Sequence, residues 1–379
     1  MSTGLELLDQ QDRIQNGDEE EACCALEEIA HFLHEKPFTP HSLFTSGHAQ
    51  TLAAYAWPRR RSLRKMDAYE ARLFEVEPGV RMLAHSSWQK NPKESPTLLL
   101  MHGLEGSSQS VYMIGTALKA FRAGFNIVRL NQRTCGGTEH LTPTLYDSGM
   151  SRDVRAVVRE LIERDELKRI FVCGFSMSGN IVLKYAGEEA GSLPREISGV
   201  IAVSPSVDLF ASANAIKRRE NWIYHKSFMI DLRSRMRRKK RLFPDIYDTR
   251  GLSSIRTMRQ FDERFTAQHG GYSNADDYYA RASALPLIKR IRTPTLIIHA
   301  QDDPFIPYEP LKNRAVTENP YVITLAPRHG GHVGFISNET DAEDRFWAEN
   351  RIVEFCRLIE ETRRRRDTET RRKEQTKRN

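Results

Sequence analysis

Short apolar runs alternate with amphipathic helical segments from Ala71 onward, and this alternation is the strongest constraint on the fold. The runs predict six core strands: Thr97–Met101, Asn126–Leu130, Ile170–Cys173, Gly199–Val203, Thr295–His299 and Val322–Leu325. The helical segments that separate and follow them are Ser110–Phe121, Ser151–Arg164, Gly179–Gly187 and Ala342–Glu360. Strands that are apolar throughout are buried on both faces, which is typical of a parallel sheet covered by helices. A hairpin formed by Arg72–Glu77 and Val80–Ser86 brings the predicted sheet to eight strands, most of them parallel.

The same pattern divides the chain into five segments. A helical lead-in covers residues 1–60 and contains an amphipathic helix over 17–35. The core occupies residues 61–205 and resumes over 286–361, and the helical, basic insertion 206–285 between them is expected to cap the strand ends. Residues 362–379 hold nine Lys/Arg, three Asp/Glu and few apolar side chains, which predicts a frayed helix or a disordered tail.

Charge and cysteine content exclude several classes of protein. The 379 residues carry a formal net charge of +7, and residues 362–379 alone contribute +6, so the body is not a basic nucleic-acid-binding surface and no specific nucleic-acid partner is expected. Five cysteines, an odd and sparse set without metal-type spacing, predict reduced thiols, with neither a zinc site nor a disulfide framework. No apolar run approaches the roughly 20 residues of a membrane span, and the acidic N-terminus lacks the charge order of a signal peptide, so we expect a cytoplasmic protein.

Two basic stretches have more than one interpretation. Arg233–Arg241 contains seven Lys/Arg in nine residues, and the tail 362–379 contains nine in eighteen. Each can be a solvated surface, or each can contact phosphate or anionic lipid headgroups and hold the protein weakly at the periphery of a membrane.

The segment Cys173-Gly174-Phe175-Ser176-Met177-Ser178-Gly179 lies between a predicted strand and a predicted helix. A nucleophile elbow needs this context, because the tight turn accepts only small residues two before and two after the nucleophile. Gly174 and Ser178 meet that requirement, so Ser176 is the candidate nucleophile. An ordinary strand-to-helix turn is the alternative interpretation.

A serine hydroxyl requires a base, and the base requires an anion that holds its tautomer. The carboxylates Asp302 and Asp303 follow the strand that ends at His299, and we choose Asp303 because it lies four residues before Pro307, with Asp302 as the alternative. His332 follows the last strand in a loop that Gly331 allows to turn sharply; it is preferred to His329 as the base.

A glycine-containing loop, His102-Gly103-Leu104-Glu105-Gly106, follows the first core strand. Such a loop can turn a backbone N–H inward, so the amides of Leu104 and Met177 are expected to form an oxyanion hole. His102 and Gly103 are expected to support this loop. No metal or organic cofactor is required by this set of residues.

At these motifs the chain resembles the YheT-like branch of the α/β-hydrolases, which also holds abhydrolase-domain lipases and medium-chain ester synthases. The resemblance runs from about Pro37 to Phe355, and its motifs include Gly47-His48-Ala49-Gln50-Thr51, Asn131-Gln132-Arg133-Thr134-Cys135, Phe261-Asp262, Tyr278-Tyr279 and Gly330-Gly331-His332-Val333-Gly334. It implies the α/β-hydrolase fold, a Ser176–Asp303–His332 triad and ester chemistry on acyl chains. Two positions depart from the family pattern, because Ser178 and Thr134 each stand where glycine is usual.

The predicted function is hydrolysis of carboxylic esters with short-to-medium acyl chains, including lipid esters, through an acyl-enzyme on Ser176. Transfer of the same acyl group to an alcohol is a close alternative. A non-catalytic hydrolase-fold protein that binds a membrane or a partner through its basic segments is a second.

Overall fold

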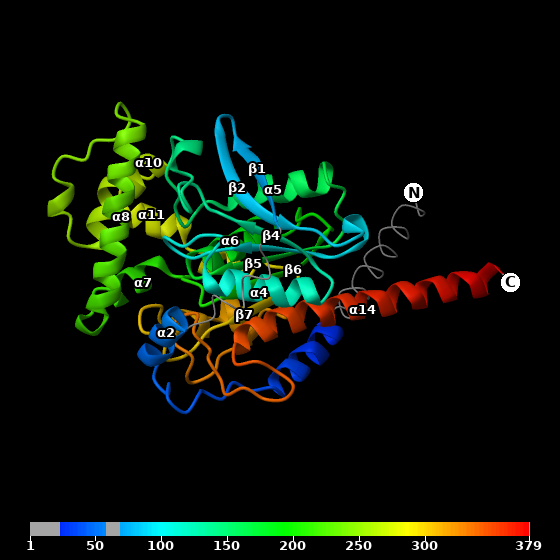
Figure 1. The fold of residues 1–379 in the computed structure, drawn as a ribbon. Coiled ribbons are helices and arrows are strands. Elements are labelled where there is room, and N and C mark those ends of the chain that lie inside the picture. The colour runs from blue at the N-terminus through cyan, green and yellow to red at the C-terminus, as the bar shows by residue number, and fades with distance from the viewer. Residues whose placement is uncertain (1–22, 58–68, 379) are drawn as a thin grey trace, which may run out of the picture.

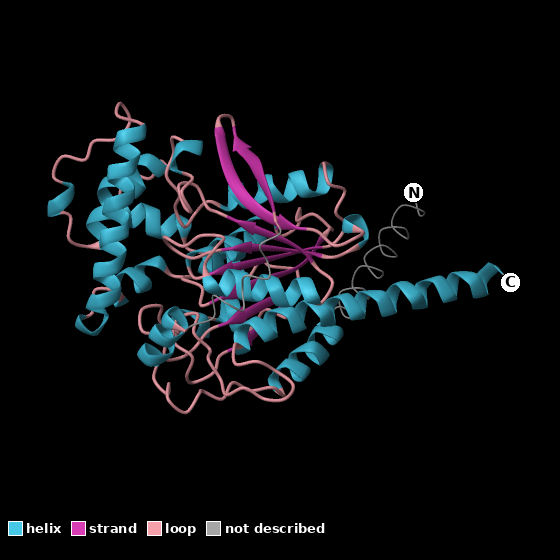
Figure 2. Cartoon of the chain, viewed as in Figure 1, coloured by secondary structure: helices cyan, strands magenta, loops and turns pink. Residues whose placement is uncertain are grey.

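The computed structural model describes residues 23–57 and 69–378, and its centre is one eight-stranded sheet (Figures 1 and 2). The strands lie in the order β1-β2-β4-β3-β5-β6-β7-β8. Their bounds are β1 Glu70–Glu77, β2 Val80–Ser87, β3 Thr97–Met101, β4 Asn126–Leu130, β5 Ile170–Phe175, β6 Ile197–Val203, β7 Thr295–Ile298 and β8 Val322–Leu325. The six strands β3–β8 are parallel, whereas β2 is antiparallel to both β1 and β4. The prediction of a mostly parallel eight-stranded sheet is confirmed.

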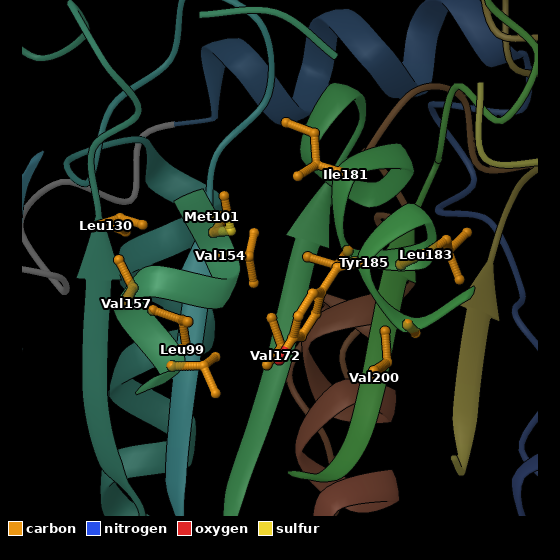
Figure 3. Close-up of a cluster of buried hydrophobic side chains, with 14 of the residues drawn as sticks. Leu99, Met101, Leu130, Val154, Val157, Val172, Ile181, Leu183, Tyr185 and Val200 are labelled. Atoms are coloured by element: carbon orange, nitrogen blue, oxygen red, sulfur yellow. The ribbon is translucent and has the colours of Figure 1, made fainter. Parts of the chain in front are cut away.

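Helices cover both faces of this sheet. The helices α5 (Ser151–Glu163), α6 (Met177–Glu189) and α12 (Leu285–Ile288) bury one face in the cluster drawn in Figure 3. The helices α4 (Val111–Arg122) and α14 (Trp347–Arg378), with the helical residues 23–34, bury the other. The short helix α13 (Arg314–Thr317) belongs to the segment of the chain that connects β7 to β8.

Strand β3 shows why these apolar runs form a central strand. Successive side chains of a strand point to opposite faces. Leu98 and Leu100 accordingly join the core under α4 and α14, whereas Leu99 and Met101 join the core under α5 and α6. All four are buried, and each contributes roughly 1.5–3 kcal/mol through burial, so an all-apolar run is stable only between two helical layers.

The α-helices between β6 and α12 lie at the carboxyl ends of the parallel strands (Figure 1, left). They are α7 (Leu209–Ala215), α8 (Trp222–Leu242), α9 (Met258–Phe261), α10 (Ala267–Gly270) and α11 (Ala275–Ala282), with a π-helical turn at Asp262–Thr266. These helices enclose an apolar cluster of their own that includes Met236, Phe261 and Phe265. The segment therefore covers the edge of the sheet at which the candidate site residues end their strands.

The basic run of α8 is largely committed to internal contacts. Arg235 and Lys239 are buried, and Lys239 Nζ donates to the carbonyls of Glu139 and Thr142. Arg238 pairs with Glu139 at 2.5 Å. The run is therefore not a uniformly solvated helix face, and only part of its charge is available to an anionic surface.

The two ends of the chain differ from the sequence-based expectations in extent. The N-terminal helix is described from residue 23, where Leu26, Ile29 and Leu33 are buried, and residues 17–22 of the predicted helix lie outside the described residues. Helix α14 begins at Trp347 rather than at Ala342 and continues to Arg378, away from the sheet (Figure 1), where a frayed helix or disorder was predicted. Arg, Lys and Glu are strong helix formers, so a charge-dense sequence can extend a helix that is already anchored. No helix in the described ranges is long and apolar enough to cross a membrane.

Candidate active site

Ser176 lies in the turn between β5 and α6. Its backbone adopts φ 55° and ψ −116°, a combination that L-residues rarely take and that is typical of a strained nucleophile elbow. The turn is so tight that a Cβ at Gly174 would lie 2.1 Å from the carbonyl oxygen of Ser178. The predicted elbow is thus formed, and Gly174 is required by this close approach.

A chain of hydrogen bonds links Ser176, His332 and Asp303. His332 Nε2 lies 2.9 Å from Ser176 Oγ, and His332 Nδ1 lies 2.7 Å from Asp303 Oδ2. The other carboxylate oxygen of Asp303 accepts from the amides of Phe305 and Ile306 at 3.1 and 2.9 Å. Because a carboxylate only accepts, His332 Nδ1 carries the proton and Nε2 is free to accept the serine proton.

The two alternative residues form a separate pair. Asp302 Oδ2 lies 3.2 Å from His329 Nδ1, and Asp302 Oδ1 accepts from the amide of Gly331 at 3.0 Å. The structure therefore brings Asp303 and His332 to Ser176, whereas Asp302 holds the loop that carries His332.

Residues far away in the sequence support the histidine loop. Gly331 has φ +60°, and a Cβ there would lie 2.3 Å from the carbonyl oxygen of Gly47. The amide of His332 donates to Thr51 Oγ1 at 2.9 Å, and the amide of Val333 donates to Ser204 Oγ at 3.1 Å. Thr51 belongs to α2 (Gly47–Ala56), in the lead-in. Sequence reasoning missed both hydroxyls, although the Gly47–Thr51 motif was a signal for one of them.

The predicted oxyanion donors lie beside Ser176. Leu104, Met177 and Ser176 line one cavity, whose empty volume is about 810 Å³. Within residues 23–57 and 69–378, no hydrogen bond occupies the amide of Leu104 or of Met177. The neighbouring amide of Gly103 donates to the hydroxyl of Tyr112 at 3.0 Å, which fixes the loop. Two free donors next to a serine hydroxyl suit the stabilisation of a developing oxyanion.

The cavity also has an apolar portion. Side chains from α7, α8, α9 and the loop after β7 line it: Leu209, Ile216, Phe228, Leu232, Met258, Phe261, Phe305 and Ile306. The ring of Phe305 lies 4.2 Å from that of His332. The cap segment and the core therefore together line a largely apolar cavity beside Ser176.

Comparison with known proteins agrees with this geometry. The profile of the alpha/beta hydrolase fold family matches residues 96–339. The chain belongs to this family. It is 31% identical to YheT of Escherichia coli K12, itself only provisionally named an esterase, over 86% of this chain and 94% of that protein. It is 32% identical to a protein of Saccharomyces cerevisiae named monoacylglycerol lipase, over 69% of this chain and 59% of that one, so the chain spans less than two thirds of the yeast relative.

A solved structure shares the fold of this alpha/beta hydrolase family member. The Pyrococcus furiosus esterase Pf2001 superposes with a TM-score of 0.50 at 16% identity, over 76% of this chain and 92% of that one.

The departure of this family member at Ser178 has a structural reason. Ser178 Oγ donates to the carbonyl of His102 at 2.5 Å and accepts from Gln132 Nε2 at 2.8 Å. The Nε2 of His102 accepts from the amide of Gln132 at 3.1 Å, so its Nδ1 donates to the carbonyl of Gly103. Burial lowers the pKa of His102 to about 4, and the ring stays neutral in this role. Ser178 therefore joins the elbow to the loop that carries Leu104.

The second departure, Thr134, carries strain. Its φ is +65°, which glycine adopts without cost and a β-branched residue does not. Its buried hydroxyl has no hydrogen-bond partner within the described part of the chain. Nothing in the structure compensates for this substitution.

An ion pair connects the cap segment to the loop after β3, and sequence reasoning missed it. Arg235 of α8 lies 2.6 Å from Glu105; the Arg235 side chain is buried and the Glu105 side chain is 10% exposed. Glu105 has φ 55°, its amide donates to the hydroxyl of Tyr146 at 2.9 Å, and that hydroxyl donates back to Glu105 Oε1 at 3.0 Å. Because Glu105 directly follows Leu104, this network sets the backbone position of a predicted oxyanion donor.

Proposed function

We propose that this protein is a serine hydrolase that cleaves carboxylic esters of short-to-medium acyl chains. The observation that carries the proposal is the hydrogen-bonded chain Ser176–His332–Asp303, with distances of 2.9 and 2.7 Å. In this assignment Ser176 is the nucleophile, His332 the general base and acid, and Asp303 the group that orients the imidazole.

In the first half-reaction Ser176 Oγ attacks the ester carbonyl carbon while its proton moves to His332 Nε2. The carbonyl oxygen becomes an oxyanion that accepts from the amides of Leu104 and Met177, each such donor contributing about 3 kcal/mol to transition-state stability. His332 then protonates the departing alcohol, and the acyl group remains on Ser176. In the second half-reaction His332 Nε2 takes a proton from water while the water oxygen attacks the acyl carbon. The bond from the acyl carbon to Ser176 Oγ then breaks, His332 returns the proton to Ser176 Oγ, and the carboxylic acid is released.

The substrate class is supported by the cavity and by the relatives. The predominantly apolar lining suits an acyl chain, and the names of the bacterial and yeast relatives are those of an esterase and a lipase. A small-molecule or lipid ester is therefore the proposed substrate, and none of the proposed steps requires a cofactor.

A fluorophosphonate probe, which reacts only with an activated serine, tests the assignment. We expect labelling of the full chain and its complete loss in Ser176→Ala. Turnover of p-nitrophenyl esters of graded acyl length then gives the chain-length preference, with Ser253→Ala, at an exposed serine of the cap segment, as a control that keeps the labelling site. Folded protein that neither labels nor hydrolyses any ester of the series would refute the proposal and favour a non-catalytic binding role.

The fate of the acyl-enzyme is read from the products. With an acyl donor in water we expect the free acid, and addition of ethanol should leave the acid as the main product. Ethyl ester as the main product would assign the same site to acyl transfer, because the cap would then exclude water in favour of the alcohol.

A further inference from the structure

One wall of the active-site cavity is polar and ionisable, which simple acyl-chain binding does not require. It contains the carboxyl of Asp262, the hydroxyls of Thr266 and Tyr279, and the guanidinium of Arg235. Each of these residues is at most 8% exposed. Polar groups buried in this way cost free energy unless they are paired, so the question is which of their hydrogen-bonding positions are filled within the protein and which remain open to the cavity.

The local backbone aims two of these side chains at the cavity. Residues Asp262–Thr266 form a π-helical turn, in which the amide of Ala267 donates to the carbonyl of Asp262 five residues earlier. The flanking Phe261 and Phe265 are buried in the core of the cap. Single π-turns occur frequently at functional sites because the extra residue re-aims the side chains around it. Here Asp262 and Thr266 both line the cavity.

Two hydrogen bonds hold the carboxyl of Asp262 in place, but no cationic side chain forms an ion pair with it in the described part of the chain. Its two oxygens accept from Thr266 Oγ1 at 2.8 Å and from the hydroxyl of Tyr279 at 2.7 Å. In the described part of the chain no Lys, Arg or His nitrogen lies within 4.0 Å of it. Burial raises the pKa of Asp262 to about 6. A carboxylate offers about four acceptor positions, so two hydrogen bonds leave capacity for another donor.

Arg235 supplies the complementary group. Its Nη1 is paired with Glu105, whereas its Nε has no hydrogen-bond partner within the described residues. It is close enough to Asp262 to influence the carboxyl electrostatically. The wall therefore offers an acceptor at Asp262 and a donor at Arg235, and Glu105 joins it to the loop of Leu104 next to Ser176.

We propose that Asp262, Thr266, Tyr279 and Arg235 form a subsite for a hydroxyl group carried by the ester substrate. A hydroxyl donates and accepts at once, which matches an acceptor and a donor facing the same space. A charged group fits worse, because the carboxyl disfavours an anion and the guanidinium disfavours a cation. The hydroxyl can belong to the alcohol portion of the ester or to the acyl chain. This inference rests on the proposed esterase function.

Paired substrates test the subsite. The first pair is propyl butyrate and 2,3-dihydroxypropyl butyrate, and the second is ethyl butyrate and ethyl 4-hydroxybutyrate. We expect the wild-type chain to favour the hydroxylated member of one pair in kcat/KM, and Asp262→Asn to reduce that preference about tenfold, as loss of a hydrogen bond to a charged group does. The responding pair identifies which half of the ester carries the hydroxyl.

Two further variants keep the test decisive. Thr266→Val removes a hydrogen-bond donor to Asp262 without changing the charge, and it should reduce the same preference. This variant provides the measurement if Asp262→Asn fails to fold. Asp276→Asn makes the matched change at an exposed cap carboxylate and should leave the preference unchanged. If the wild-type chain shows no preference in either pair, or if both Asp262→Asn and Thr266→Val retain it, the subsite is refuted while the esterase proposal stands. Hydrolysis of none of the four esters would instead count against the proposed function.

Discussion

Replacing Asp303 by Asn tests which aspartate acts as the proposed acid. The same substitution at the neighbouring Asp302 provides the matched comparison. In Asp303→Asn the side-chain oxygen must keep accepting from the amides of Phe305 and Ile306. The new amide group then takes the place of the oxygen that lies 2.7 Å from His332 Nδ1. An amide nitrogen only donates, so Nδ1 must accept and the ring proton moves to Nε2. That proton then points at Ser176 Oγ, where a base is needed.

The expected size of the loss follows from this tautomer change. Loss of the correct tautomer costs about 10⁴ in kcat in a serine protease triad, which corresponds to about 5 kcal/mol of transition-state stabilisation. Asp302→Asn keeps an acceptor for the amide of Gly331 and leaves the tautomer of His332 intact, so we expect about tenfold or less. The assay is kcat on a p-nitrophenyl ester, with a urea unfolding curve for each variant. A loss of less than tenfold in Asp303→Asn, or a larger loss in Asp302→Asn, would refute the assignment of the acid.

Three further outcomes follow from the buried charges and the strained backbone. Arg235→Met leaves Glu105 as an unpaired, largely buried carboxylate, so the free energy of unfolding in urea should fall by about 3–5 kcal/mol and kcat should fall with it. The control variant Arg237→Met, at an exposed arginine, should change neither quantity. Wild-type stability in Arg235→Met would show that the ion pair does not stabilise the fold. Thr134→Gly relieves a positive φ and removes an unpartnered buried hydroxyl, so it should raise the free energy of unfolding by about 1 kcal/mol, and a decrease would contradict the strain. Burial raises the pKa of Asp262 to about 6, so the folded state binds the carboxyl proton more tightly than the unfolded chain does. The contribution of Asp262 to the free energy of unfolding should therefore decline by about 3 kcal/mol as pH rises from about 4 to 6. Urea unfolding curves across that pH range should show this decline in the wild type and not in Asp262→Asn. Parallel pH profiles of the two unfolding free energies would contradict the raised pKa of Asp262.

Much of the proposed catalytic centre could be predicted because each part carries a local signal. Ser176 follows an apolar strand within a pattern of small residues that only a tight turn requires. Asp303 and His332 each follow a later strand, and parallel strands bring their carboxyl ends to one edge of the sheet. Strand order along the chain was therefore enough to expect that the three side chains meet, although not enough to give their distances.

Other contacts were beyond sequence reasoning because their partners are distant and individually unremarkable. Thr51 supports the amide of His332 from 281 residues away, and the Gly47–Thr51 motif marks this segment without indicating which group the threonine contacts. The basic run of α8 predicted a solvated or lipid-facing surface, yet Arg235 and Lys239 from it are buried against carboxylate and carbonyl groups. Charge density in a sequence does not reveal which face of a helix is covered.

The sequence by itself determined the strands, the elbow and the order of the proposed nucleophile, acid and base, since these depend on side-chain periodicity and on turns of a few residues. Only the tertiary structure decided which aspartate reaches His332, how Ser178 and Glu105 tie the neighbouring loops together, and that Asp262 faces the same cavity as Ser176. The physical reason is the separation along the chain over which each kind of interaction acts. Burial patterns and turn sterics act between neighbours along the chain, whereas hydrogen bonds and ion pairs in the site join atoms that become neighbours only after the sheet and its cap have packed.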